Sequence, residues 1–235
     1  MNVDLKSQNP AMLRLLGDTN TIVFLDANIF IPPDRSYLGA SIKPMDFQWF
    51  KDNWLEPLFV IFLNLAIHEA VYDELIGNLV KTYVDAKINT DPARLQIFYD
   101  TDLTDLESRL LITFIHKLSV HSSYNPDMNN SKDRGEVRSL SYMAVKGYLY
   151  FAANDDLPRR LIENACELRT GLDGMSFLHV YELIFLLYKK RCSDPKALKT
   201  LYKYIYFMTK HEKNTNPEWS VFIDCMDVLY SGYLL

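Results

Sequence analysis

Short apolar runs alternate with stretches of helical periodicity along the first three quarters of the chain. Three runs have the length and the β-branched or aromatic character of buried strands: Thr21–Asp26, Leu58–Leu65 and Tyr148–Ala153. Between and after them, apolar side chains recur three or four positions apart, which is typical of amphipathic helices. Strands that alternate with helices form a mostly parallel sheet with helices on both faces. The pattern therefore predicts a three-layer α/β/α fold.

The predicted helices have recognisable ends. Thr104 and Glu107 have the spacing of a capping box, and Gly147 is placed to end a helix that begins at Gly135. A polar loop is predicted over Ser122–Lys132. The apolar stripe expected on the helix within residues 92–120 consists of Leu106, Leu110, Phe114 and Leu118. The other predicted helices are a short one near residues 47–54, one over His68–Leu79, one with Pro158 in its first turn, and three after about Ser176.

The length of 235 residues is compatible with one domain or two. We expect a main α/β domain over residues 1–190, with a helical insertion at about residues 80–130. Residues 191–235 are expected to form a C-terminal helical extension packed on that domain. No internal repeat of 20 to 50 residues is visible.

The composition is that of a globular chain, with 49% hydrophobic and 23% charged residues. The longest apolar run, Leu58–Ile67, is shorter than the roughly 20 residues that a membrane-spanning helix needs. We expect no membrane association, and the N-terminus has no secretory signal pattern. Three cysteines lie far apart, which argues against a disulfide framework or a thiolate zinc site and favours a cytoplasmic location.

The net charge of −5 hides one basic segment, Lys189–Lys213, which has a net charge of +6. Its lysines at 196, 199, 203 and 210 are predicted to lie on one helical face, opposite Leu198 and Leu201. A lysine-rich face is most often the solvated side of an amphipathic helix, and it also suits the phosphates of a nucleic acid. Lys196, Lys199 and Lys203 are therefore candidate RNA-binding residues.

Acidic residues fall where a parallel sheet would gather them. Asp26 ends the first predicted strand, Asn154–Asp156 end the last one, and Asp133 and Glu136 open a helix. The helix that follows the second predicted strand contributes Glu69, Asp73 and Glu74. Ligands of such sheets bind at the carboxyl ends of the strands, and oxygen ligands suit Mg²⁺ or Mn²⁺. Converging carboxylates raise one another's pKa values when no cation lies between them.

Each of these acidic residues could also have a purely structural role. Asp26 could form a turn, Asp133 and Glu136 have the spacing of a capping box, and Asp156 could be a helix N-cap. Among the acids after the second predicted strand, one or two must face solvent. The five histidines form no cluster, and His68 and His116 are predicted to be structural or exposed.

The order of four motifs resembles that of the PIN-domain nucleases. The motifs are Ile22-Val-Phe-Leu-Asp-Ala-Asn28, His68-Glu-Ala-Val-Tyr-Asp-Glu-Leu75, Asp133-Arg-Gly-Glu136 and Phe151-Ala-Ala-Asn-Asp-Asp156. The resemblance implies that Asp26, Glu74, Glu136 and Asp155 are catalytic residues that chelate a divalent metal, with Asp133 and Asp156 as neighbours. Asn28, Arg159 and Arg160 also match the family pattern, and the resemblance implies that they contact RNA.

What the resemblance implies is hydrolysis of RNA phosphodiesters that depends on Mg²⁺ or Mn²⁺, in a toxin-like or an RNA-processing protein. RNA would be the main partner, with an antitoxin or a second copy of the chain as further partners. The 59 positions from Glu74 to Asp133 exceed those of the small toxin members, and the helical tail is additional.

Two other functions remain open from the sequence. A haloacid-dehalogenase-like phosphatase also places an Asp after its first strand, but it needs a second Asp two residues later, where this chain has Asn28. A PIN-like module without catalytic activity would retain the fold and bind a partner.

Overall fold

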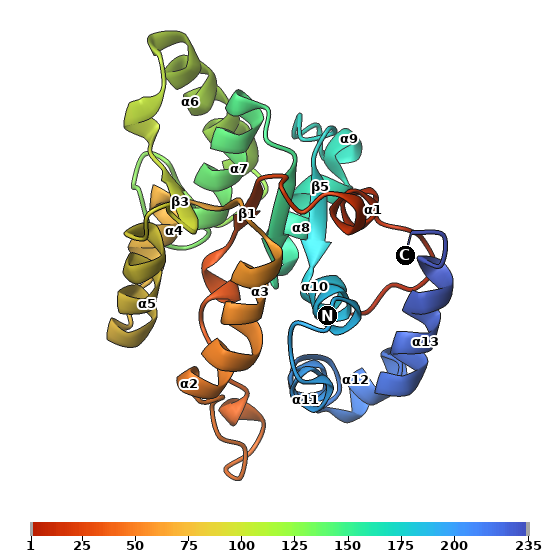
Figure 1. Cartoon of the computed structure of the whole chain (residues 1–235). Coiled ribbons are helices and arrows are strands. Elements are labelled where there is room, and N and C mark those ends of the chain that lie inside the picture. The colour runs from red at the N-terminus through yellow and green to blue at the C-terminus, as the bar shows by residue number, and fades with distance from the viewer. Residues whose placement is uncertain (1, 234–235) are drawn as a thin grey trace. The chain divides into compact units, whose positions relative to one another are not determined.

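The computed structural model describes residues 2–233, apart from the side chain of Asn78, and it confirms the predicted α/β class. Five parallel strands form a sheet flanked by helices, as a three-layer α/β/α fold requires (Figure 1). The strands are β1 (Val23–Leu25), β2 (Leu65–His68), β3 (Leu95–Phe98), β4 (Tyr150–Ala153) and β5 (Ser176–His179). Their order across the sheet is β3-β2-β1-β4-β5.

The chain divides into two compact units. The sheet unit consists of Ile22–Ile31 and Asn64–Leu178, and the helical unit contains the rest of the described chain. The helices of the sheet unit are α4 (Glu69–Glu74), α5 (Asn78–Ile88), α6 (Asp105–Ser119), α7 (Arg134–Lys146), α8 (Asp156–Glu163) and α9 (Ala165–Leu168). Those of the helical unit are α1 (Pro10–Gly17), α2 (Phe47–Phe50), α3 (Glu56–Ile61), α10 (Val180–Lys189), α11 (Pro195–Tyr206), α12 (Lys210–Thr215) and α13 (Trp219–Leu229). The domain boundary expected at residue 190 stays a prediction.

The core of the sheet unit lies against one face of the sheet. Phe24 in β1 is paired in register with Ala66 in β2 and with Phe151 in β4, and all three side chains are fully buried. They belong to one apolar cluster with side chains of α6, α7, α8 and α9. Leu25, which points to the opposite face, is buried as well. Burial on both faces explains why β1 appears in the sequence as a continuous apolar run.

The helical unit contains a buried carboxylate. Glu182 of α10 accepts hydrogen bonds from Asn9 Nδ2 at 2.7 Å and from the His179 amide at 2.9 Å. Its other oxygen accepts from the Tyr230 hydroxyl at 3.4 Å. These bonds tie the segment before α1 to α10 and to the end of α13. None of the helices between residues 2 and 233 combines the length and the apolar character that crossing a membrane requires.

The predicted strand over Leu58–Leu65 is wrong. Residues 56–61 form α3, with Pro57 in its first turn, and the strand β2 starts only at Leu65. The residues from Phe47 to Leu55 lead into α3 as α2 and a π-helical turn. An unbroken apolar run has no periodicity that separates a strand from a buried helix, and a proline directly before the run favours the helix.

Two predicted helices are interrupted. The helix expected over His68–Leu79 is α4 followed by α5, with Gly77 as the N-cap of α5. The helix expected over residues 92–120 begins at Asp105, because Leu95–Phe98 form β3. A four-residue strand at the edge of a sheet leaves a weak pattern, since only Leu95 of β3 is fully buried. The expected helical insertion at residues 80–130 therefore contains a strand.

The expected apolar stripe of α6 is confirmed at Leu118 but wrong at its beginning. The buried side chains are Leu111, Ile115 and Leu118, whereas Leu106 and Leu110 are 68% and 44% exposed. The capping box of Thr104 and Glu107 is present as predicted. The helix therefore starts where the sequence indicates, but it is rotated relative to the expected stripe.

The C-terminal part differs from the expectation of three helices after Ser176. Residues 176–179 form β5, and four helices follow, α10 to α13. A short segment such as Ser176–His179 has no periodicity that separates a strand from a helix. Because α10 begins directly after it, the sequence does not indicate where the strand ends.

Candidate metal centre

The strand order defines where a ligand should bind. From β1 the chain continues outward to β2 and β3, and it then returns to the other side of β1 for β4 and β5. Ligands of open parallel sheets bind beyond the carboxyl ends of the strands at such a switch point, here between β1 and β4. Asp26 directly follows β1, and Asp155 comes two residues after the end of β4.

Asp26 is a buried carboxylate with a free coordination position. Its side chain is 2% exposed, and its backbone amide donates to the Ala152 carbonyl at 3.0 Å, which fixes the residue beside β4. Within residues 2–233, Oδ1 of Asp26 has no hydrogen-bond partner. Burial, followed by the charges of Glu136, Asp155 and Glu74, raises the pKa of Asp26 well above its usual value.

Asn28 connects the two strand ends. Its Nδ2 donates hydrogen bonds to Asp26 Oδ2 and, at 2.8 Å, to Asp155 Oδ2. Its Oδ1 accepts from the Asn154 amide at 2.9 Å. The side chain that was expected to contact RNA is thus hydrogen-bonded to the protein on both sides, and it orients two of the candidate ligands.

Glu136 completes a group of three carboxylates. It lies in the first turn of α7, and one oxygen each of Asp26, Glu136 and Asp155 lie within 4.8 Å of one another. Burial is the main reason that the pKa of Glu136 is raised to about 7, and the negative charges of Glu74, Asp155 and Asp133 add to the effect. Three oxygen ligands at such distances suit a hard divalent cation.

Glu74 approaches from the end of α4. Its Oε1 accepts a hydrogen bond from the Gly135 amide at 2.8 Å, so it lies against the first turn of α7. Burial raises the pKa of Glu74, whereas this hydrogen bond and the charge of Arg134 lower it. The charge of Glu74 in turn raises the pKa of both Asp26 and Glu136, as expected for a fourth member of the same acidic group.

Asp133 and Asp156, which were expected to be neighbours of the metal ligands, have other interactions than these four acids. Asp133 has a left-handed backbone with φ of 59°, and its Oδ2 accepts from the Ser123 amide at 2.6 Å. The capping box considered for Asp133 and Glu136 does not form among the described residues, since Asp133 makes no cap bond to α7. Asp156 has a 71% exposed side chain and forms an ion pair with Arg159, which lowers the pKa of its carboxyl group.

Arg159 and Arg160, which were named as RNA contacts, bind other residues of this chain. Arg159 pairs with Asp156 and with Glu163 Oε2, the latter at 2.9 Å, and Arg160 donates to the His121 carbonyl at 2.7 Å. The lysines of α11 are exposed at positions 196, 199 and 203, whereas Lys210 belongs to α12 and does not continue their face. Their binding of RNA stays a prediction.

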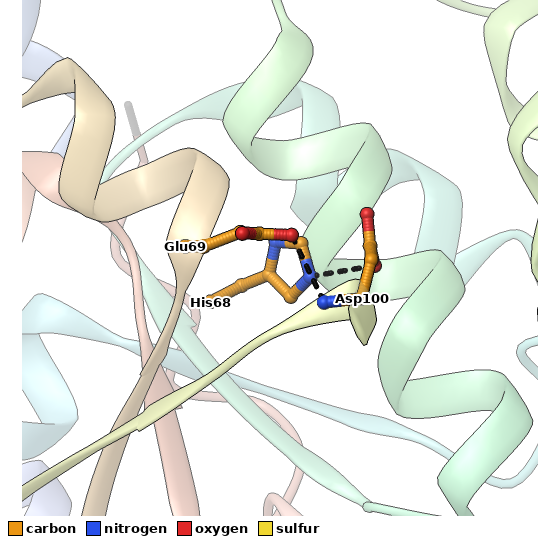
Figure 2. A group of neighbouring side chains, drawn as sticks. All are labelled: His68, Glu69 and Asp100. Atoms are coloured by element: carbon orange, nitrogen blue, oxygen red, sulfur yellow. Dashed lines mark hydrogen bonds and ion pairs between the residues drawn. The ribbon is translucent and has the colours of Figure 1, made fainter. Parts of the chain in front are cut away.

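A second acidic group with a histidine lies at the ends of β2 and β3 (Figure 2). The buried His68 accepts a hydrogen bond from the Ala70 amide through Nδ1, at 3.2 Å. Its proton is therefore on Nε2, which donates to Asp100 Oδ1 at 3.0 Å. An imidazole with both nitrogens engaged in this way is unsuited to bind a metal, so His68 is a buried capping residue.

This network anchors the helix that bears Glu136. Asp100 donates its backbone amide to Glu69 Oε1 at 2.9 Å (Figure 2). Its carboxylate also forms an ion pair with Arg138 of α7. Burial alone would raise the pKa of Asp100, but the hydrogen bond from His68 and the hydrogen bond and charge of Arg138 hold it below the usual value. Sequence reasoning missed Asp100 and Arg138, because nothing in their spacing indicates that they meet.

Gly135 is a further residue that the sequence analysis missed. A glycine in the first turn of a helix, directly before a candidate ligand, is a detectable signal because glycine is unfavourable in helices. The four acids, by contrast, were named from the sequence, and all four belong to one electrostatically coupled group. An acidic group of this kind, with an unpaired buried oxygen on Asp26, fits Mg²⁺ or Mn²⁺ as a ligand set. Comparison of the chain with protein-family models, with curated protein sequences and with solved structures gives no match.

Proposed function

We propose that this protein is a divalent-metal-dependent ribonuclease of the PIN-like type. The observation that supports it most is the convergence of Asp26, Glu74, Glu136 and Asp155 at the switch point of a parallel sheet. These acids come from four separate chain segments, and Asp26 is buried with an unpaired oxygen. Buried like charges destabilise a fold unless a cation or a proton compensates them.

The protein groups have separable roles in this proposal. Asn28 holds the carboxylates of Asp26 and Asp155 in fixed orientations, and Gly135 holds Glu74. Glu136, with a pKa of about 7, exchanges its proton near neutral pH in the metal-free protein. A bound Mg²⁺ or Mn²⁺ supplies the chemistry of phosphodiester hydrolysis, since it activates water and stabilises charge on the phosphate.

Asn28 favours a nuclease over a phosphatase of the haloacid-dehalogenase type. That phosphatase chemistry needs a carboxylic acid two residues after the nucleophilic Asp, and the amide of Asn28 cannot transfer a proton in this role. The choice of RNA as substrate, an antitoxin or a second copy as partner, and a cytoplasmic location follow from the resemblance and from three free cysteines. They are parts of the same proposal.

The test is cleavage of a mixed RNA pool with Mn²⁺, with and without EDTA. We expect cleavage that EDTA abolishes and that falls at least about 100-fold in Asp26→Asn and in Glu136→Gln, because each variant loses a metal ligand but keeps the side-chain shape. Asp156→Asn is the matched control and should retain activity, since its carboxylate is exposed and paired with Arg159.

Equal cleavage by wild type and both ligand variants would contradict the proposed site. Phosphate release from p-nitrophenyl phosphate without RNA cleavage would favour the phosphatase. Mn²⁺ binding without either activity would favour a binding module.

A further inference from the structure

Gly135 occupies a position where glycine is intrinsically unfavourable. It is the second residue of α7, between Arg134 and Glu136, and it is buried. Its backbone does not have a positive φ, so the local conformation suits any L-residue. Glycine is less favourable than alanine in a helix. The requirement for glycine must therefore come from its surroundings.

The surroundings are the carboxylate of Glu74. The Gly135 amide donates to Glu74 Oε1 at 2.8 Å. A Cβ atom at residue 135 would lie 2.7 Å from each oxygen of Glu74 and 2.8 Å from its Cδ. These distances are far below van der Waals contact, and the side chain of Glu74 is the part that can move away.

A second contact joins the same two turns. Arg134 Nη2 lies 3.3 Å from Asp73 Oδ2, so the last two residues of α4 contact the first two residues of α7. Glu136 is the next residue of that turn of α7. The first turn of α7 thus contains Glu136 and also hydrogen-bonds Glu74, so it fixes the positions of these two carboxylates relative to each other.

We propose that Gly135 is the positioning residue for Glu74. Its amide binds Oε1, its missing side chain leaves room for the carboxylate, and Oε2 is the oxygen that remains for the cation. This inference rests on the proposed function, because it assigns Glu74 to the same metal centre.

The test is Gly135→Ala, compared with wild type in two measurements. In EDTA, we expect an unchanged or raised melting temperature, because alanine favours the helix and only the end of the Glu74 side chain must move. In a Mn²⁺ titration followed by calorimetry, we expect at least a tenfold weaker affinity. Gly174→Ala is the matched control: its added Cβ meets no atom within 4 Å, so affinity and melting temperature should both be retained.

A double-mutant cycle shows whether Gly135 acts through Glu74. In a Glu74→Ala background no carboxylate remains to be displaced, so adding Gly135→Ala should leave the Mn²⁺ affinity unchanged. A further loss of tenfold in that background would overturn the inference, as would wild-type affinity in Gly135→Ala alone. If Asp26→Asn abolishes Mn²⁺ binding while Gly135→Ala binds Mn²⁺ as tightly as wild type, the positioning role fails and the metal centre stands. If wild type binds no Mn²⁺, both fail.

Discussion

The side-chain amide of Asn28 lies 2.8 Å from Asp155 Oδ2, across 127 positions of sequence. A single neutral side chain therefore joins the ends of β1 and β4, since the same nitrogen also donates to Asp26. In the metal-free protein, this amide supplies positive hydrogen atoms between two carboxylates that would otherwise repel each other.

Asn28→Asp should therefore destabilise the metal-free protein by about 1–3 kcal/mol, because it replaces a donor by a third carboxylate. With Mn²⁺ present, we expect a larger stabilisation than in wild type, since the new carboxylate is a further oxygen ligand. Urea unfolding in EDTA and in Mn²⁺ measures both effects. Asn2→Asp adds the same charge at an exposed position outside any helix and should change neither quantity. Equal behaviour of the two variants would show that Asn28 does not separate the acids.

Neutralising one of the converging acids should stabilise the protein in EDTA. Asp26→Asn and Asp155→Asn each remove repulsion, so we expect equal or higher melting temperatures than in wild type. Mn²⁺ at a hundred times its dissociation constant should stabilise wild type by about 2.7 kcal/mol, and these variants much less. Asp156→Asn provides the comparison with an exposed acid. If all proteins show the same shift on addition of Mn²⁺, the acids do not form one site.

The buried Glu182 should make stability depend on pH. Burial raises its pKa above the usual 4.5, despite hydrogen bonds from His179, Asn9 and Tyr230 and the charge of His179. Because the folded state holds this proton more tightly, the resulting stability is complete below pH 4.5 and is lost as pH rises through the raised pKa.

Glu182→Gln imitates the protonated carboxyl group. Its free energy of unfolding in EDTA should vary less with pH than that of wild type, and its advantage should grow from pH 5 to pH 8. Urea unfolding across this range is the measurement. A parallel pH dependence in variant and wild type would mean that Glu182 contributes nothing to it.

Loss of the ion pair between Arg138 and Asp100 should weaken the sheet unit. Arg138→Ala leaves a half-buried carboxylate with His68 as its remaining side-chain partner, and we expect a loss of about 1–3 kcal/mol in unfolding free energy. The loss should be the same with EDTA and with Mn²⁺, because Arg138 stabilises α7 rather than the cation. A loss confined to the Mn²⁺ samples would instead place Arg138 in the metal centre.

The sequence predicts the candidate ligands better than it predicts the elements between them. Asp26 and Asp155 follow apolar runs that are long enough to be strands, and Glu136 opens a helix with clear periodicity and a closing Gly147. The strand β3 was missed because only one of its four residues is fully buried, and β5 was missed because it continues directly into a helix.

Residue roles that depend on tertiary contacts could not be predicted from spacing. Asn28 was named only from a resemblance between motifs, and its bond to Asp155 exists because β1 and β4 are neighbours in the sheet. The same holds for Gly135, because its lack of a side chain matters only where the carboxylate of Glu74 lies against it. Leu106 and Leu110 show the converse case, since their helical spacing is correct but no core lies against them.

The division of the chain into units also bears on the order in which they can form during synthesis. All residues of the sheet unit, including the four acids, lie before His179. The helical unit needs Glu182 to meet Asn9 and Asn216 to accept from Val3 at 2.9 Å, so it can close only after most of the chain has left the ribosome. We therefore expect the acidic group to assemble on the nascent chain before the segment with Val3 and Asn9 can bind Asn216 and Glu182.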